Sequence, residues 1–362
     1  MCGPIGRYKG ARTGLSILAP LIRAAFVFHN PRRALLEAVV AGTEPDTALL
    51  GLNHLDAFGV DARLHDAWLT RREWPRPLRR LAWSARELPL PWEVRWADVV
   101  FTPLANLFPL TARLRRRLPV VIVNYGLNLI LQRSTRARRE VLAASLRSAA
   151  AVVCLGKAQR ERVIELAALD PARVHVVLLG ADVDWFRPHA PARGEPSVLT
   201  VGRDLARDVA TFADAVARLG VRAEIVGHPR TLAGVRLPPN ARVRTNLSAT
   251  ALREAYARAA CVVVPQHPDG YPYGSESGGL TTVCEAFAMG KPVVATDRAV
   301  LRDYLDPDEL VPPRDPAALA AAVEAALGDE ARGARSRRRA EERHSTRRFA
   351  EGLAPILRNS RQ

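Results

Sequence analysis

The second half of the chain alternates short runs of apolar, β-branched residues with longer segments of helical periodicity. This alternation is typical of β-α-β units, in which helices join parallel strands. The predicted helices of this half include residues 209–219 and 249–259. The predicted strands are residues 197–201, 223–226, 261–264 and 292–295.

The first half shows the same alternation less clearly, with predicted strands at residues 60–64, 98–101, 120–123, 151–154 and 174–178. Strands that are apolar throughout favour a sheet covered by helices on both faces. The length of 362 residues exceeds what a single core usually holds, about 250 to 300 residues. Prolines and polar residues accumulate between Pro188 and Pro196. We therefore predict an α/β protein with domains at 1–188 and 189–328, followed by a basic helix or tail at 329–362.

An apolar run from Leu15 to Phe28 follows three basic residues, as in a secretory signal. Pro20 and Arg23 interrupt the run, so we expect no signal peptide. No uninterrupted apolar run reaches the roughly 18 residues that a transmembrane helix needs. The four cysteines lie far apart without metal-ligand spacing, which favours reduced, buried thiols.

The segment most informative about chemistry is residues 278–296, GGLTTVCEAFAMGKPVVAT. A glycine-rich loop that enters a helix presents unpaired backbone N–H groups and the positive end of the helix dipole, which together bind anions. Thr281 and Thr282 add hydroxyl groups at the same helix start. Glu285 lies one turn further on, where its carboxylate can accept hydrogen bonds from the two hydroxyls of a ribose. Gly290 then ends the helix.

Segments 174–188, 197–203 and 237–265 precede this one in an order and spacing that resemble the retaining glycosyltransferases of group 1, family 4. The resemblance covers about residues 149–305. It implies the GT-B fold, with two Rossmann-like domains whose parallel sheets face each other across a cleft. It also implies transfer of a sugar, with retention, from a nucleotide-diphosphate donor to a hydroxyl acceptor such as a lipid-linked or cell-envelope glycan. No metal ion or other cofactor is implied.

Carried over by position, the resemblance assigns donor binding to Gly202, Arg203, Arg207, Arg244, Thr245, Gly279, Leu280, Thr281, Thr282 and Glu285. Glu285 would bind the ribose, and Arg203 would contact the diphosphate, for which its forked guanidinium is suited. Arg244 and Thr245 fall where the backbone of the family meets the nucleobase.

The chain departs from the family pattern at three places. The family usually has a lysine where this chain has Asp208, so Arg207 is the candidate substitute. Where the family commonly has a glutamate, this chain has Ser277, with Glu276 beside it. Tyr125 occupies the place of a first-domain histidine. The catalytic candidates are therefore Arg203, Glu276 and Tyr125, and a weakly active or inactive nucleotide-sugar-binding protein is the alternative function.

The chain has 53 Lys+Arg against 37 Asp+Glu, a net charge of +16. Arginines surround five clustered tryptophans, Trp68, Trp74, Trp83, Trp92 and Trp96. Trp and Arg are both suited to an anionic membrane surface. We therefore expect a cytoplasmic protein, with peripheral binding to the inner face of the membrane as one hypothesis and core tryptophans as the alternative. Nucleic-acid binding is a distant third function, because no known nucleic-acid motif accompanies the charge. The eight arginines of residues 331–348 are expected on the solvated face of one long helix.

Overall fold

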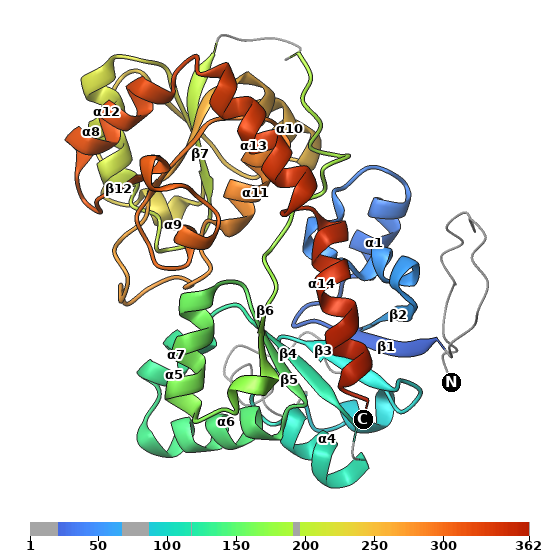
Figure 1. The fold of residues 1–362 in the computed structure, drawn as a ribbon. Coiled ribbons are helices and arrows are strands. Elements are labelled where there is room, and N and C mark those ends of the chain that lie inside the picture. The colour runs from blue at the N-terminus through green and yellow to red at the C-terminus, as the bar shows by residue number, and fades with distance from the viewer. Residues whose placement is uncertain (1–20, 67–86, 117, 191–195, 362) are drawn as a thin grey trace.

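Two parallel β-sheets organise the computed structural model, which describes residues 21–66, 87–116, 118–190 and 196–361 (Figure 1). The first sheet has the strand order β2-β1-β3-β4-β5-β6. Its strands are β1 (Ile22–Val27), β2 (Val60–His65), β3 (Val99–Thr102), β4 (Val120–Asn124), β5 (Ala151–Cys154) and β6 (Val174–Val176). The apolar side chains of β3, β4 and β5 are buried, as the sequence predicted for a covered sheet.

The second sheet has the order β12-β11-β10-β7-β8-β9 and is also parallel. Its strands are β7 (Ser197–Gly202), β8 (Ala223–Gly227), β9 (Ala241–Arg244), β10 (Ala259–Val264), β11 (Val293–Thr296) and β12 (Leu310–Val311). The chain runs outward from β7 to β9 and then returns to place β10 on the other side of β7. Ligands of open α/β sheets bind at such a reversal, beyond the carboxyl ends of the two strands.

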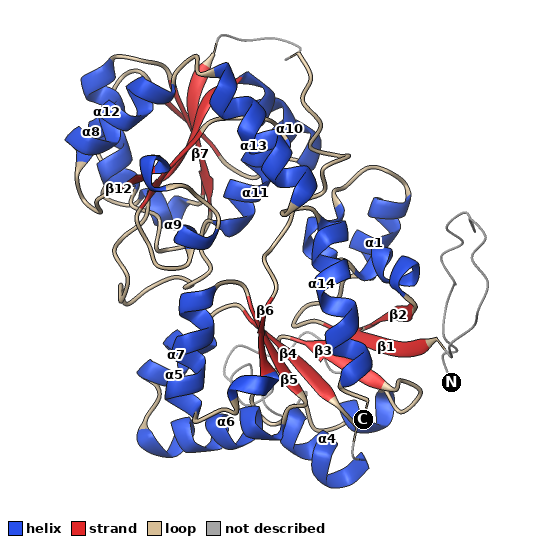
Figure 2. Ribbon diagram, viewed as in Figure 1, coloured by secondary structure: helices blue, strands red, loops and turns tan. Residues whose placement is uncertain are grey.

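Helices cover both faces of each sheet (Figure 2). The first sheet carries η1 (Asp46–Leu49), η2 (Leu52–Phe58), α1 (Arg33–Val40), α3 (Leu90–Glu93), α4 (Phe108–Arg116), α5 (Leu127–Arg133), α6 (Arg136–Ser148) and α7 (Lys157–Ala167). The second carries α8 (Val209–Leu219), α9 (Pro229–Leu232), α10 (Ala249–Arg258), α11 (Leu280–Ala288) and α12 (Pro316–Ala326). Short 3-10 turns are η5 (Pro171–Arg173), η6 (Leu301–Asp303) and η7 (Pro307–Glu309). One apolar core runs from Phe26 and Phe101 in the first sheet to Phe287 of α11.

All nine predicted strands overlap observed strands, and α8 coincides with the predicted helix 209–219. The α/β fold with two parallel sheets is therefore confirmed. Strand β1 was not predicted, because Arg23 interrupts the apolar run in which it lies. The Arg23 side chain leaves the sheet and pairs with Asp98 at 3.0 Å, so it does not break the buried strand.

The C-terminal segment was predicted as one long helix with solvated arginines, and this prediction is wrong. Helix α13 (Glu330–Glu342) ends before His344, and α14 (Thr346–Asn359) begins in a new direction (Figure 1). Arg337 donates to the carbonyl oxygens of Phe186 and Ala288 at 3.2 and 2.6 Å, so part of the basic charge supports the fold. Helix α14 crosses back and packs against η2 of the first sheet.

The division into domains at 1–188 and 189–328 stays a prediction, as does the separate tail at 329–362. Among the described residues, no helix is both long enough and apolar enough to span a membrane.

Candidate functional site

The most unusual group at the carboxyl ends of β7 and β10 is the buried guanidinium of Arg207. The residue is 5 % exposed. Its Nη2 donates to Oγ1 of Thr282 at 2.8 Å, while Nε and Nη1 have no hydrogen-bond partner among the described residues. Burial lowers the pKa of Arg207 to about 10, so the group still carries its charge at neutral pH. A buried cation with two unused donor atoms is costly unless an anion binds there.

The turn after β7 places Arg207 at this point. Gly202 ends β7, and a β-carbon there would overlap the Arg207 guanidinium. Asp204 closes the turn by accepting from the backbone N–H of Ala206 at 2.8 Å. Asp208, which stands where the family has a lysine, is the N-cap of α8 and accepts from Thr211 N–H at 3.1 Å. Asp208 therefore shapes the helix start, and Arg207 supplies the inward-facing charge.

Helix α11 begins beside this guanidinium. Gly279 has a φ of 94°, and a β-carbon there would lie 2.7 Å from Cγ1 of Val264 at the end of β10. Leu280 is buried, whereas Thr281 is exposed. The Thr282 hydroxyl donates to the carbonyl oxygen of Val201 at 3.1 Å and accepts from Arg207. Of the two threonines, Thr281 is thus the one at the surface, and Thr282 links β7, Arg207 and α11.

Glu285 lies in the next turn of α11 and is 7 % exposed. Its Oε2 accepts from the Tyr256 hydroxyl at 2.8 Å. Burial raises the pKa of Glu285 to about 7, and the Tyr256 hydrogen bond opposes that rise. The structure therefore brings the side chains of Arg207, Thr282 and Glu285 to one end of the second sheet.

The other donor-site candidates lie in less enclosed places. Arg203 is exposed and makes no hydrogen bond or ion pair with the residues that the structure describes. Arg244 donates to Glu224 at 3.0 Å, and Arg258 also contacts that carboxylate at 3.1 Å. Thr245, just after β9, is exposed.

The candidates Glu276 and Tyr125 meet where the two sheets' domains touch. Asn128 of α5 donates to Glu276 Oε1 at 3.0 Å, and Gln159 of α7 donates to Glu276 Oε2 at 3.4 Å. Burial raises the pKa of Glu276. The hydroxyls of Ser275 and Ser277 both donate to the backbone carbonyl of Tyr125 at 2.7 Å. Glu276 is thus held by amides from the other domain, and the contact of Tyr125 with this loop is through its backbone.

Sequence reasoning missed Asn128, Gln159 and Arg298. Arg298 is 4 % exposed and donates to Gln266 and, at 3.1 Å, to Asp269. For Arg298 the sequence held a signal: it lies just beyond β11, which pairs with β10, so it is close to the reversal point where ligands bind. The loop residues His267 and Asp269 serve local structure: His267 stacks on Tyr271, and Asp269 accepts from Arg298.

Two α/β domains with parallel sheets, and a buried cation beside a helix N-terminus at the reversal point of the second sheet, fit the GT-B fold that the family resemblance implies. Residues 38–185 match the family model described as Glycosyltransferase Family 4, and residues 195–329 match the model Glycosyl transferases group 1. The chain belongs to the group 1/family 4 glycosyltransferases, so the family resemblance is confirmed.

Solved structures share the fold at low sequence identity. A sucrose-phosphate synthase from Thermosynechococcus elongatus is 20 % identical, with a TM-score of 0.71 over 93 % of this chain and 98 % of the other. Anabaena HepE in complex with UDP and glucose is 14 % identical, with a TM-score of 0.68 over 93 % and 99 %. A trehalose-6-phosphate synthase from Burkholderia multivorans is 13 % identical, with a TM-score of 0.64 over 94 % and 97 %. No curated protein matches the sequence.

Proposed function

We propose that this glycosyltransferase moves a sugar from a nucleotide-diphosphate donor to a hydroxyl acceptor with retention of anomeric configuration. The observation that carries the donor proposal is the buried Arg207 guanidinium with its unused Nε and Nη1 atoms beside the start of α11. A diphosphate bound beside this helix start would balance the buried charge. HepE, which has the same fold, was crystallised with UDP and with UDP-glucose, which supports a donor of this chemical class.

In this proposal the donor's negative charge is met by protein groups, without a metal ion or other cofactor. Arg207 and the first N–H groups of α11 stabilise the diphosphate as the bond to the sugar breaks. Arg203, exposed at the same turn, contacts the outer side of the diphosphate, and Glu285 accepts hydrogen bonds from the ribose hydroxyls. Such fixed groups act most strongly on charge that develops during the reaction, and removing one typically costs about 10²- to 10³-fold in kcat.

In this proposal the acceptor hydroxyl attacks the sugar from the same face that the diphosphate leaves, so the anomeric configuration is retained. A leaving phosphate oxygen then takes the proton of the incoming hydroxyl, so correct placement of the two substrates carries most of the catalysis. Glu276 and Tyr125 stay the residues proposed to border the reacting sugar from the domain contact.

The test is a titration of UDP, GDP and ADP, followed by turnover of the matching labelled sugar donor. Arg207→Ala should weaken nucleotide-diphosphate binding at least tenfold, while Arg207→Lys should restore part of it. Arg218→Ala, an exposed arginine on α8, is the matched control. Unchanged diphosphate binding in Arg207→Ala would refute the donor site. Binding without any turnover would favour the alternative, an inactive nucleotide-sugar-binding protein.

We propose in addition that the enzyme is cytoplasmic and binds the inner membrane surface through its tryptophan- and arginine-rich segment to reach a lipid-linked or cell-envelope acceptor. Trp68, Trp74 and Trp83 lie outside the described residues. Trp92 is 41 % exposed, which fits a membrane contact, whereas Trp96 packs against the core of the first sheet. Flotation with vesicles that contain anionic lipid tests this proposal. Flotation that is equal with neutral vesicles, or absent with both, would reject it.

A further inference from the structure

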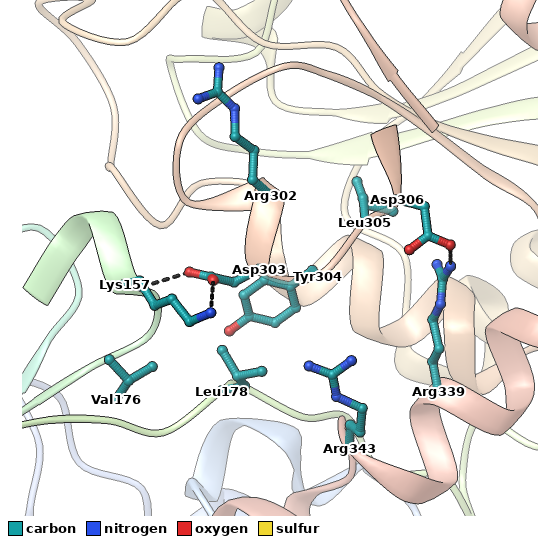
Figure 3. Close-up of a pocket in the computed structure, with 10 residues that line it drawn as sticks. All are labelled: Lys157, Val176, Leu178, Arg302, Asp303, Tyr304, Leu305, Asp306, Arg339 and Arg343. Carbon is teal, nitrogen blue, oxygen red and sulfur yellow. Dashed lines mark hydrogen bonds and ion pairs between the residues drawn. The ribbon is translucent and has the colours of Figure 1, made fainter. Parts of the chain in front are cut away.

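A pocket separate from the donor cluster lies at the domain junction. Its volume is about 410 Å³, which is within the range of small-molecule sites. It is lined by Lys157, Val176, Leu178, Arg302, Asp303, Tyr304, Leu305, Asp306, Arg339 and Arg343 (Figure 3). None of these residues belongs to the donor cluster around Arg207 and Glu285.

Most of the charged groups around this pocket are already paired. Asp303 accepts from the backbone N–H of Lys157 at 2.6 Å, at the start of α7. Asp306 pairs with Arg339, whose Nη1 also donates to Glu309 at 2.6 Å. Arg302 makes two hydrogen bonds to Asp297, at 2.7 and 2.8 Å, and points away from the other lining side chains in Figure 3. The acidic groups are therefore occupied.

Two cations remain available. The Lys157 ammonium is 3.8 Å from Asp303, a distance too long for a strong hydrogen bond, and its side chain is 80 % exposed. Arg343 follows α13 directly, is exposed, and makes no side-chain hydrogen bond or ion pair within the described part of the chain. Figure 3 shows both charged groups on the same pocket, near the Tyr304 ring.

The rest of the lining is apolar. Val176, Leu178 and Leu305 present aliphatic side chains. The Tyr304 hydroxyl is fully used, because it donates to the Leu155 carbonyl at 2.8 Å and accepts from Leu179 N–H at 2.7 Å. Tyr304 therefore has no free polar group for a ligand, and its ring stacks on that of His344 with the centroids 4.8 Å apart. A ligand that fits this lining carries a compact, strongly anionic group next to a less polar surface.

We propose that this pocket binds a small phosphate-bearing molecule, whose phosphate contacts Lys157 and Arg343. Arginine and lysine both bind phosphate through charge-assisted hydrogen bonds. The ligand contacts three parts of the fold at once: the start of α7 with β6, the segment after η6, and the end of α13. Its occupancy therefore adds contacts between the two domains at a place separate from the donor.

The experiment uses inorganic pyrophosphate as the probe in calorimetric titrations of the full chain. Because pyrophosphate also fits the donor site, the titration is made in an Arg207→Ala background. The expected result is one remaining site, whose affinity falls about tenfold with Arg343→Ala and again with Lys157→Ala, and recovers with Arg343→Lys. Arg338→Ala, which changes an exposed arginine on α13, should leave the affinity unchanged.

The inference fails if the Arg207→Ala protein binds no pyrophosphate, or if Arg338→Ala weakens binding as much as Arg343→Ala. A nucleotide-diphosphate titration of Arg343→Ala alone separates the two proposals. Normal affinity there, together with weaker pyrophosphate binding when Arg343→Ala is added to the Arg207→Ala background, supports the proposal for this pocket. Nucleotide-diphosphate affinity that is lost only in Arg207→Ala supports the donor site by itself. Circular dichroism and thermal melting show that each variant is folded.

Discussion

Oγ1 of Thr282 lies 2.8 Å from Nη2 of Arg207, and the same hydroxyl donates to the Val201 carbonyl at 3.1 Å. The threonine therefore orients the guanidinium from the first turn of α11 and ties that helix to β7. Because Nη2 is fixed in this way, Nε and Nη1 are the guanidinium atoms without a hydrogen-bond partner among the described residues.

Thr282→Val should remove this support while keeping the side-chain shape. We expect the dissociation constant of a nucleotide diphosphate to rise about tenfold, because the guanidinium loses its fixed orientation. The free energy of unfolding should fall by about 1 to 3 kcal/mol, since buried polar groups lose their partner. Calorimetry and chemical denaturation measure the two effects. Thr282→Ser keeps the hydroxyl and should behave like the parent; if it binds as weakly as the valine variant, the hydroxyl is not the cause.

The sequence predicted those features of the fold and site that depend on residues close together in the chain. Strand β7, helix α8 and the glycine-led start of α11 follow from periodicity and from residues close together in the chain. From the sequence, Arg207 could be proposed only as a substitute for the missing lysine. Its burial under Gly202 could not be predicted, because that burial depends on how the turn at Asp204 closes. The amide contacts of Glu276 join residues 148 and 117 positions apart, and no local pattern carries such pairings.

Gly279 supports a second prediction, on backbone geometry. Its φ of 94° disfavours any other residue, and a β-carbon would meet Val264 and Gln266 at 2.7 and 2.6 Å. Gly279→Ala should lower the free energy of unfolding by about 2 to 4 kcal/mol and weaken diphosphate binding, because the start of α11 must shift. Gly328→Ala is the control: its φ is 76°, but a β-carbon there meets nothing within 4 Å. Equal losses in both variants would show that backbone strain alone, and not crowding at the site, explains the effect.

Glu285 predicts a pH dependence. Burial raises the pKa of its carboxyl from an ordinary value of 4.5 to about 7. Below about pH 4.5 the folded and unfolded states are both protonated, and the full stability contribution of this group is present. As the pH rises toward 7, the unfolded chain releases the proton first, so this contribution is lost. The ionised carboxylate accepts ribose hydroxyls better, so donor affinity should rise as the pH passes through about 7.

Two variants check this assignment. Glu285→Gln should remove the pH dependence of donor affinity between pH 6 and 8. Tyr256→Phe should move its midpoint to higher pH, because the Tyr256 hydroxyl donates to the carboxylate and lowers its pKa. Donor affinity is measured by calorimetry over this range. A midpoint that stays unchanged in Glu285→Gln would assign the titration to another group.

Variants of Glu276 can distinguish a positioning role of this carboxylate from a role in proton transfer. Its two carboxylate oxygens accept from Asn128 and Gln159 of the other domain, and Gln159 also donates to Ser277 at 3.1 Å. If these contacts hold the domains in register, Glu276→Ala and Gln159→Ala should each lower kcat by about tenfold. The double variant should be little worse than either single variant, because both remove one interaction. The pH profile of kcat should keep its shape. A general acid or base would give a different result: Glu276→Ala would flatten one limb of the profile and cost about 10²-fold or more, while Gln159→Ala would retain that limb.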